Sequence, residues 1–161
     1  AGGHLALLLG MARQEKDFGA DPSIQPAAIL DFFGPVDFSK MKGDLTDIHS
    51  QKGLDLLQDA GTKLLGPVAE QTAEQIKTVS PITYVSAANP HVLILQGGKD
   101  DLVPAIQSER LHEALTQAGV KNQLIALPEA GHDGPLFSTP ETAAKVIRFL
   151  NEVSENPNGH P

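Results

Sequence analysis

Two acidic residues and one histidine stand in short loops that each follow an apolar run of the sequence. Asp100 and Asp101 come directly after HVLILQGGK, and His132 lies in EAGHDGP, shortly after the run QLIAL. A carboxylate bound to one imidazole nitrogen fixes the histidine tautomer, so that the other nitrogen can take a proton from a nucleophile. These residues therefore predict an acid–histidine pair in which the acid is either Asp100 or Asp101.

Structural roles compete with this interpretation. Acidic residues near a helix start commonly cap the helix, and a single loop histidine is commonly just a partly exposed side chain. However, only one of the two carboxylates is needed as a cap, and Gly131 and Gly134 leave space around the imidazole. We therefore keep the acid–histidine pair as the hypothesis to test against these structural roles.

The elements that must position these loops alternate between strands and helices. Buried strands are expected in three segments, PAAILDFFG, HVLILQG and NQLIALP. Helices are expected in three others, GGHLALLLGMA, PAIQSERLHEALTQAG and STPETAAKVIRFLNEV. Such alternation predicts an α/β fold with a mostly parallel sheet flanked by helices, and these sheets collect chemistry in the loops after their strands.

Helix-end signals refine the last two helices. Pro104 is expected to be the first residue of one helix and Gly119 its stop, while Thr139 is expected to cap the other, with Pro140 in its first turn. The last helix is expected to bury one apolar face, made of Ala143, Val146, Ile147 and Leu150.

A polar, helix-prone stretch at 37–79 separates the first two strands. Its two helical pieces are expected in GLDLLQDAGTKLLG and VAEQTAEQIKTV, and the first has a leucine stripe at Leu54, Leu57, Leu64 and Leu65. We therefore expect a helical insertion near 37–79.

Composition excludes other classes of protein. The 161 residues fit one domain, the net charge is −8, and there is no cysteine for disulfides or thiolate metal sites. An acidic chain argues against nucleic acid or an anionic membrane surface as main partner. No apolar run approaches the ~20 residues of a membrane span, no cluster has metal-ligand spacing, and the compartment and oligomeric state stay undetermined.

The opening AGGHLALLLGMA carries glycines directly before a run that is apolar on every side. Helices of this kind are normally buried within a larger fold. The expectation is a chain that starts in mid-fold, with the N-terminal half of the domain absent.

Three segments carry a resemblance to a known family: AGGHLA, LQGGKDDLVP and LPEAGHDGPLF. With a serine placed before Ala1, the opening reads S-A-G-G-H-L-A, and Gly2 ends a G-x-S-x-G nucleophile elbow. The chain resembles the C-terminal half of an α/β-hydrolase esterase, similar to hormone-sensitive lipase and to bacterial feruloyl or acetyl esterases. The resemblance implies a partial α/β-hydrolase domain at 1–153, and a flexible tail is expected at 154–161.

The resemblance also assigns the site. In the family pattern H-G-x-x-D-x-x-V-P the acid lies four positions before the proline, which gives Asp100, and His132 matches the base. The backbone N–H of Ala1 would be one oxyanion donor. Gln96 stands where the family often has histidine, with no catalytic consequence expected. The implied substrate is a small ester, no cofactor or metal is implied, and the chain alone is expected to be inactive because the serine is not in it.

Other interpretations stay open. The same fold would suit a prolyl-oligopeptidase-type peptidase or an arylformamidase, and a non-catalytic remnant or binding module is the third possibility. Structural roles are expected for the remaining acids and histidines, namely His4, Asp31, Asp37, His49, His91, His112 and Asp133.

Overall fold

A computed structural model describes residues 1–15, 18, 21 and 23–155 of the chain. Its sheet has three parallel strands in the order β1 (Ala28–Phe32), β2 (His91–Gly97) and β3 (Asn122–Leu127). All three expected strands are confirmed. Every residue of the central strand β2 is buried, as its continuous apolar sequence indicates.

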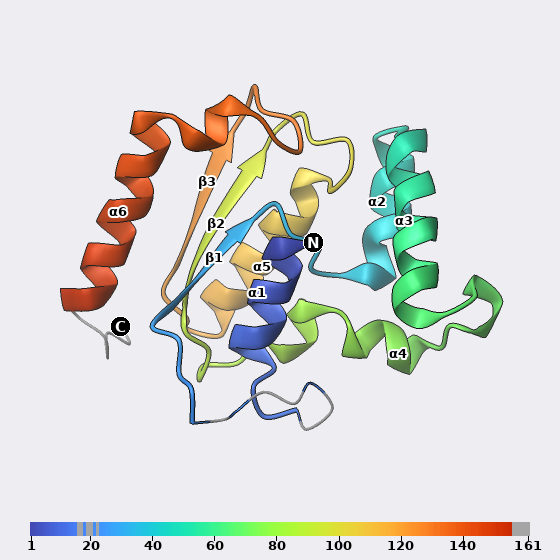
Figure 1. Cartoon of the computed structure of the whole chain (residues 1–161), viewed down its shortest axis with the longest axis horizontal. Helices are drawn as coiled ribbons and strands as arrows, with labels where there is room; N and C mark the ends of the chain where they lie inside the picture. Colours follow the sequence, from blue (N-terminus) through green and yellow to red (C-terminus); the bar gives the residue numbers. More distant parts are fainter. Residues whose placement is uncertain (16–17, 19–20, 22, 156–161) are drawn as a thin grey trace.

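Three long helices cover the sheet. Helices α1 (Gly2–Met11) and α5 (Ala105–Gln117) lie on one face, and α6 (Pro140–Glu155) lies on the other (Figure 1). Side chains of β2 alternate between the two resulting cores. Val92 and Ile94 pack with residues of α1 and α5, while Leu93 and Leu95 pack with residues of α6. The sheet is therefore covered on both faces, which confirms the expected α/β layering.

The helical insertion is more broken than the sequence suggests. It contains α2 (Phe38–Asp47), α3 (Gln51–Leu65), the 3₁₀ turn η2 (Val68–Glu70) and α4 (Ala73–Thr78), followed by a second 3₁₀ turn, η3 (Pro81–Tyr84). The expected first piece is confirmed as α3, the second is split between η2 and α4, and α2 was not predicted. The leucine stripe is also incomplete, since Leu64 of α3 is half exposed.

Buried polar contacts attach this insertion to α5. Arg110 makes a bidentate pair with Asp44 of α2, with both N–O distances at 2.6 Å, and the Gln107 amide donates to the same carboxylate at 2.6 Å. Burial acts to raise the pKa of Asp44, but hydrogen bonds from Arg110 and Gln107 hold that pKa below its usual value. Helix α2 is thus fixed to the core through a partly buried charge pair.

The ends of the later helices correct two expectations and confirm one. Pro104 precedes α5 as its N-cap residue rather than being its first helical residue. The Thr139 hydroxyl accepts the N–H of Thr142, so the expected cap of α6 is confirmed. Ser154 belongs to α6, which runs to Glu155, so the expected tail does not start at 154; residues 156–161 lie outside the described residues.

The expected buried face of α6 is wrong for three of its four residues, whereas the fourth, Val146, packs against the core as expected. Ala143 is exposed, as are Ile147 and Leu150, and the helix instead buries Thr142, Phe149 and Val153. Both sets repeat with helical spacing, one position apart along the sequence. The large ring of Phe149 faces the sheet, and this rotates the helix away from the expected stripe.

Candidate active site

The two loops that carry the acid and the histidine leave neighbouring strands at the same edge of the sheet. Residues after β2 lead to Asp100 and residues after β3 lead to His132, at the upper end of the sheet in Figure 1. Their close approach depends on glycine, because a Cβ added to Gly97 would lie 2.1 Å from the carbonyl oxygen of Gly131. The N–H of Lys99 also bonds the carbonyl of Ala130 at 2.8 Å, which ties the loops together.

Asp100 and His132 form a direct pair. Nδ1 of His132 lies 2.9 Å from Oδ2 and 3.2 Å from Oδ1 of Asp100, so the expected contact is confirmed. The Asp100 side chain is fully buried, whereas that of His132 is 23% exposed. Since Nδ1 is engaged by the carboxylate, Nε2 is the nitrogen left to exchange a proton with another group.

Asp101 points elsewhere. Its carboxylate lies 3.6 Å from Nζ of Lys52 on α3, and both side chains are more than half exposed. The carbonyl of Asp101 accepts a hydrogen bond from the Ser50 hydroxyl at 2.5 Å. Of the two acids left open by the residue pattern, Asp100 is therefore the partner of the histidine, and Asp101 joins the loop to the insertion.

Backbone and side-chain donors hold the Asp100 carboxylate. Oδ1 accepts the N–H groups of Leu102 at 2.9 Å and Val103 at 2.8 Å. Oδ2 accepts the amide of Gln96 at 3.2 Å, and the oxygen of Gln96 in turn accepts the Ser108 hydroxyl at 2.7 Å. Sequence reasoning gave Gln96 no role. The available signal was a buried polar residue in an otherwise apolar strand, which must find partners.

The first turn of α1 lies against the end of β1. A Cβ added to Gly34 would lie 2.7 Å from the backbone nitrogen of His4, and one added to Gly3 would lie 2.2 Å from Oδ1 of Asp31. Ala1 is the N-cap residue of α1. The oxyanion role expected for its N–H stays a prediction.

A buried carboxyl group lies beneath this turn. Asp31 is fully buried; its Oδ1 accepts the N–H of Gly34 at 2.9 Å, and its Oδ2 has no hydrogen-bond partner among the described residues. Burial raises the pKa of Asp31 to about 7, against smaller opposing effects of the Gly34 N–H and the N-terminal ammonium. The sequence analysis gave Asp31 a structural role. As with Gln96, the available signal was a polar residue in an otherwise apolar strand.

Three other residues that were given structural roles from the sequence make structural contacts: His4, His112 and Asp37. Nε2 of His4 lies 2.7 Å from the carbonyl of Val79, its ring packs against Phe38, and burial lowers its pKa. Nδ1 of His112 bonds the side chain of Asn122. Asp37 caps α2 by accepting the N–H of Ser39.

Across residues 1–15, 18, 21 and 23–155, no group of three or more metal-binding side chains comes together. No helix in that part of the chain is both long and apolar enough to cross a membrane.

The BD-FAE family model matches residues 1–115, which include Ala1 and Asp100 and end before His132. The chain belongs to the BD-FAE family. This family match covers well over half of the 161 residues.

Curated relatives and solved structures agree with the family. The chain is 27% identical to Esterase LipC and 29% identical to Probable carboxylic ester hydrolase LipM, both of Mycobacterium tuberculosis. Each alignment covers 95% of this chain but only 38% of LipC and 36% of LipM. The chain therefore spans less than two fifths of the length of either relative.

Among solved structures, the chain resembles a bifunctional GH43-CE protein of Bacteroides eggerthii, with a TM-score of 0.75 and 28% identity over 94% of this chain and 20% of that one. It also resembles a truncated form of a carbohydrate esterase from gut microbiota, with a TM-score of 0.72 and 24% identity over 96% of this chain and 57% of that one. These likenesses show that the chain forms a portion of an α/β-hydrolase fold.

Proposed function

We propose that this BD-FAE family member is the acid–base part of a serine esterase that hydrolyses carboxylic esters through an acyl-serine. The observation that carries the proposal is the buried Asp100 carboxylate bound to Nδ1 of His132, across the ends of two neighbouring parallel strands. The esterase names of LipC and LipM support the same reaction class.

The nucleophile is proposed to be a serine directly before Ala1 in the whole protein. The glycines after Ala1 fit the end of a G-x-S-x-G elbow, and helix α1 begins at Gly2, as the helix after such an elbow does. The partial coverage of both curated relatives is compatible with further sequence in the whole protein. On this proposal the 161 residues alone form no acyl-enzyme.

The proposed steps assign one role to each group. Nε2 of His132 takes the serine proton as the oxygen attacks the ester carbonyl, and Asp100 stabilises the imidazolium through Nδ1. The N–H of Ala1 stabilises the oxyanion. Collapse of the tetrahedral intermediate breaks the ester C–O bond, and His132 returns its proton to the leaving alcohol. A water molecule then repeats the sequence on the acyl-serine and releases the acid.

The test is the longer protein that includes the residues before Ala1, assayed with short-chain p-nitrophenyl esters. We expect His132→Ala to lower kcat by roughly 10⁴- to 10⁶-fold, as losses within a nucleophile–base unit do. His112→Ala is the matched control, because that imidazole bonds only a structural partner, Asn122, and it is expected to retain near-normal turnover.

Two outcomes would overturn the proposal. Near-normal ester turnover by His132→Ala would remove the base from the mechanism. Turnover of aminoacyl anilides in clear preference to esters would favour the peptidase alternative over an esterase.

A further inference from the structure

Phe33 has an unusual backbone conformation at the edge of the candidate active site. Its φ is 47°, a left-handed value that is uncommon for a bulky side chain and costs free energy. The strained residue comes directly after β1, and its N–H still bonds the carbonyl of Leu95 at 2.9 Å. Of the described residues only His49 is another non-glycine with positive φ, and it lies between α2 and α3.

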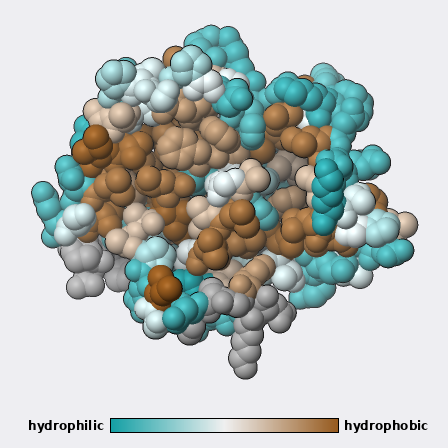
Figure 2. Space-filling view, in the orientation of Figure 1, coloured by the Kyte–Doolittle hydropathy of each residue, from teal (hydrophilic) through white to brown (hydrophobic). Residues whose placement is uncertain are grey.

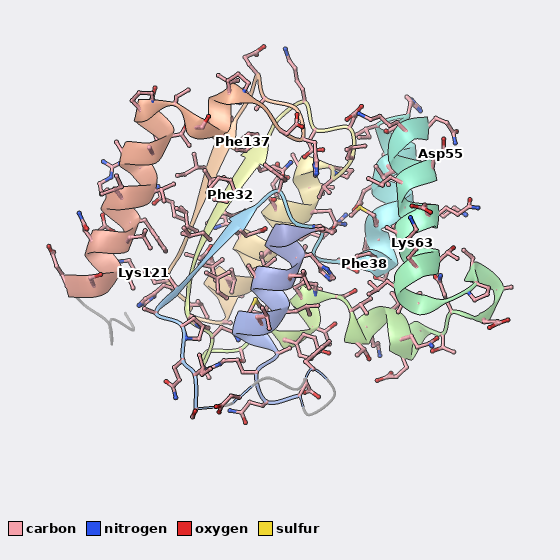
Figure 3. The ribbon with its side chains drawn as sticks, in the orientation of Figure 1. Phe32, Phe38, Asp55, Lys63, Lys121 and Phe137 are labelled. Carbon is pink, nitrogen blue, oxygen red and sulfur yellow. The ribbon has the colours of Figure 1, made fainter. Side chains whose placement is uncertain are left out.

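The left-handed conformation directs the Phe33 ring to the histidine. The centroid of the ring lies 4.6 Å from that of the His132 imidazole, and it meets the ring of Phe137 edge-on at 4.8 Å. Figure 3 shows Phe137 and Phe32 close together near the ends of the strands. Strained residues persist where the surrounding structure enforces them, and they concentrate at functional sites.

The position of Phe33 suits contact with the alcohol portion of an ester. Next along the chain, Gly34 packs on the backbone of Gly3 and His4 in the first turn of α1. Phe33 thus lies between that turn and the imidazole. A leaving alcohol oxygen must come within about 2.6–3.2 Å of the general acid nitrogen to take its proton. Carbon atoms attached to that oxygen then come within reach of a ring that touches the imidazole, whereas the acyl carbon stays on the serine.

We propose that Phe33 forms the alcohol side of the active site, where its ring holds the His132 imidazole in position and contacts the alcohol portion of the substrate. This inference rests on the proposed esterase function. Phe33 and Phe137 meet at an interplanar angle of 76° and are both half buried, so together they make an aromatic corner beside the imidazole. Aromatic rings favour offset or edge contacts with other rings. The substrate class is therefore esters whose alcohol carries a flat aromatic ring.

The first experiment tests the contact in the 161-residue chain, without any catalysis. The His132 ring protons are assigned by NMR in the wild type and in Phe33→Leu, Phe33→Tyr and Phe18→Leu variants. Phe18 is the control because it is half buried and its ring meets the ring of Tyr84 instead of His132. We expect Phe33→Leu to move the His132 signals through loss of the ring current, while Phe33→Tyr keeps them near the wild-type position and Phe18→Leu leaves them unchanged. Unmoved signals in Phe33→Leu would overturn the positioning role.

The second experiment tests the substrate contact in the longer protein. The kcat/KM of benzyl acetate is compared with that of cyclohexylmethyl acetate, whose alcohol has similar size without an aromatic face. We expect Phe33→Leu to lower the benzyl preference about two- to tenfold, the range that one aromatic contact supports. Phe33→Tyr is expected to retain the preference, as is Phe18→Leu.

The acyl side serves as the internal comparison. The ratio of benzyl acetate to benzyl butyrate turnover should stay the same in Phe33→Leu, because the acyl group lies away from Phe33. An unchanged benzyl preference in Phe33→Leu, or a change confined to the acyl ratio, would overturn the alcohol-side assignment while leaving the esterase intact. Absence of any ester turnover in the wild-type longer protein would instead refute the proposed function, and this inference would fall with it.

Discussion

The carboxyl group of Asp100 is held by more than its histidine partner. Two backbone N–H groups bind Oδ1 and the Gln96 amide binds Oδ2, so the acid is fixed before any substrate arrives. Asp101, its neighbour in sequence, instead pairs with Lys52 at the surface. At the scale of single residues, the site therefore separates two adjacent acids into one buried partner of His132 and one exposed link to the insertion.

This separation predicts different effects for the same substitution. In the longer protein, Asp100→Asn should reduce ester turnover by on the order of 10⁴-fold, because an amide favours the wrong histidine tautomer. Asp101→Asn removes only an exposed ion pair, worth up to about 1 kcal/mol, and should change turnover less than threefold. Steady-state kinetics on both variants measure this. Equal losses in the two would show that the pairing geometry does not decide catalysis.

Asp31 predicts a pH dependence of stability. Its pKa is about 7 in the folded chain and 3.8 when unperturbed, so between those values the folded state keeps a proton that the unfolded state has lost. The stability from this group is complete below the unfolded pKa and is lost as pH rises through 7. From pH 5 to pH 8, wild type should lose about 2 to 3 kcal/mol more than Asp31→Asn in urea unfolding. Parallel pH profiles for the two proteins would contradict the assignment.

At the scale of elements, the loops after β2 and β3 can meet because β2 ends in glycine. An alanine side chain at Gly97 would collide with the backbone of the histidine loop at Gly131 and Ala130. By contrast, a Cβ at Gly131 would meet only the carbonyl of Lys99, at an ordinary 3.9 Å. The sequence analysis singled out the glycines beside His132, whereas the close approach depends on Gly97, at the end of the neighbouring strand.

The two glycines therefore predict a matched pair of variants. Gly97→Ala should lower the thermal midpoint by about 2–12 °C, since overpacking of this kind costs about 1–3 kcal/mol. It should also break the Asp100–His132 contact, which NMR of the His132 ring would detect. Gly131→Ala should stay within about 2 °C of wild type. If Gly97→Ala were as stable as Gly131→Ala, the close approach of the loops would not hold.

Sequence reasoning predicted the strands well and the helical faces less well. The continuous apolar run of β2 leaves no choice of face, because both sides of that strand are covered. Helix α6 has apolar residues on two neighbouring stripes, so periodicity cannot tell that Phe149 rather than Ile147 faces the sheet. Helix α2 has only scattered apolar residues, and long-range contacts of Asp44 with α5 hold it in place. Phe33 was missed because backbone strain leaves no trace in composition.

At the scale of the whole molecule, the sheet has an open edge on its β1 side. Strand β1 pairs only with β2 within the described sheet, and a cavity of about 400 Å³ lies beside it, lined by residues of α1 and β1. Leu9 of α1 lines that cavity and is more than half exposed, as are Leu5 on the same helix and Ile147 of α6. Figure 2 shows apolar surface gathered on the side where α1, β1 and α6 face the viewer in Figure 1. Exposed apolar area of this extent favours association.

This open side predicts the behaviour of the 161-residue chain in solution. Leu9→Glu should reduce binding of a hydrophobic dye and shift the chain toward monomer in sedimentation velocity, because Leu9 lines the cavity beside β1. Leu56→Glu is the control, since Leu56 is 46% exposed on α3 and lines no described part of that cavity. An identical response to the two substitutions would mean that association does not depend on the β1 side.

The central claim is that Asp100 and His132 serve a serine that directly precedes Ala1. The most direct measurement is labelling of the longer protein with a fluorophosphonate, followed by peptide mass spectrometry to locate the adduct. We expect a single labelled residue, the serine immediately before Ala1, with labelling strongly reduced in His132→Ala. An adduct on a serine within the 161 residues, or labelling that is unaffected by loss of His132, would contradict the account.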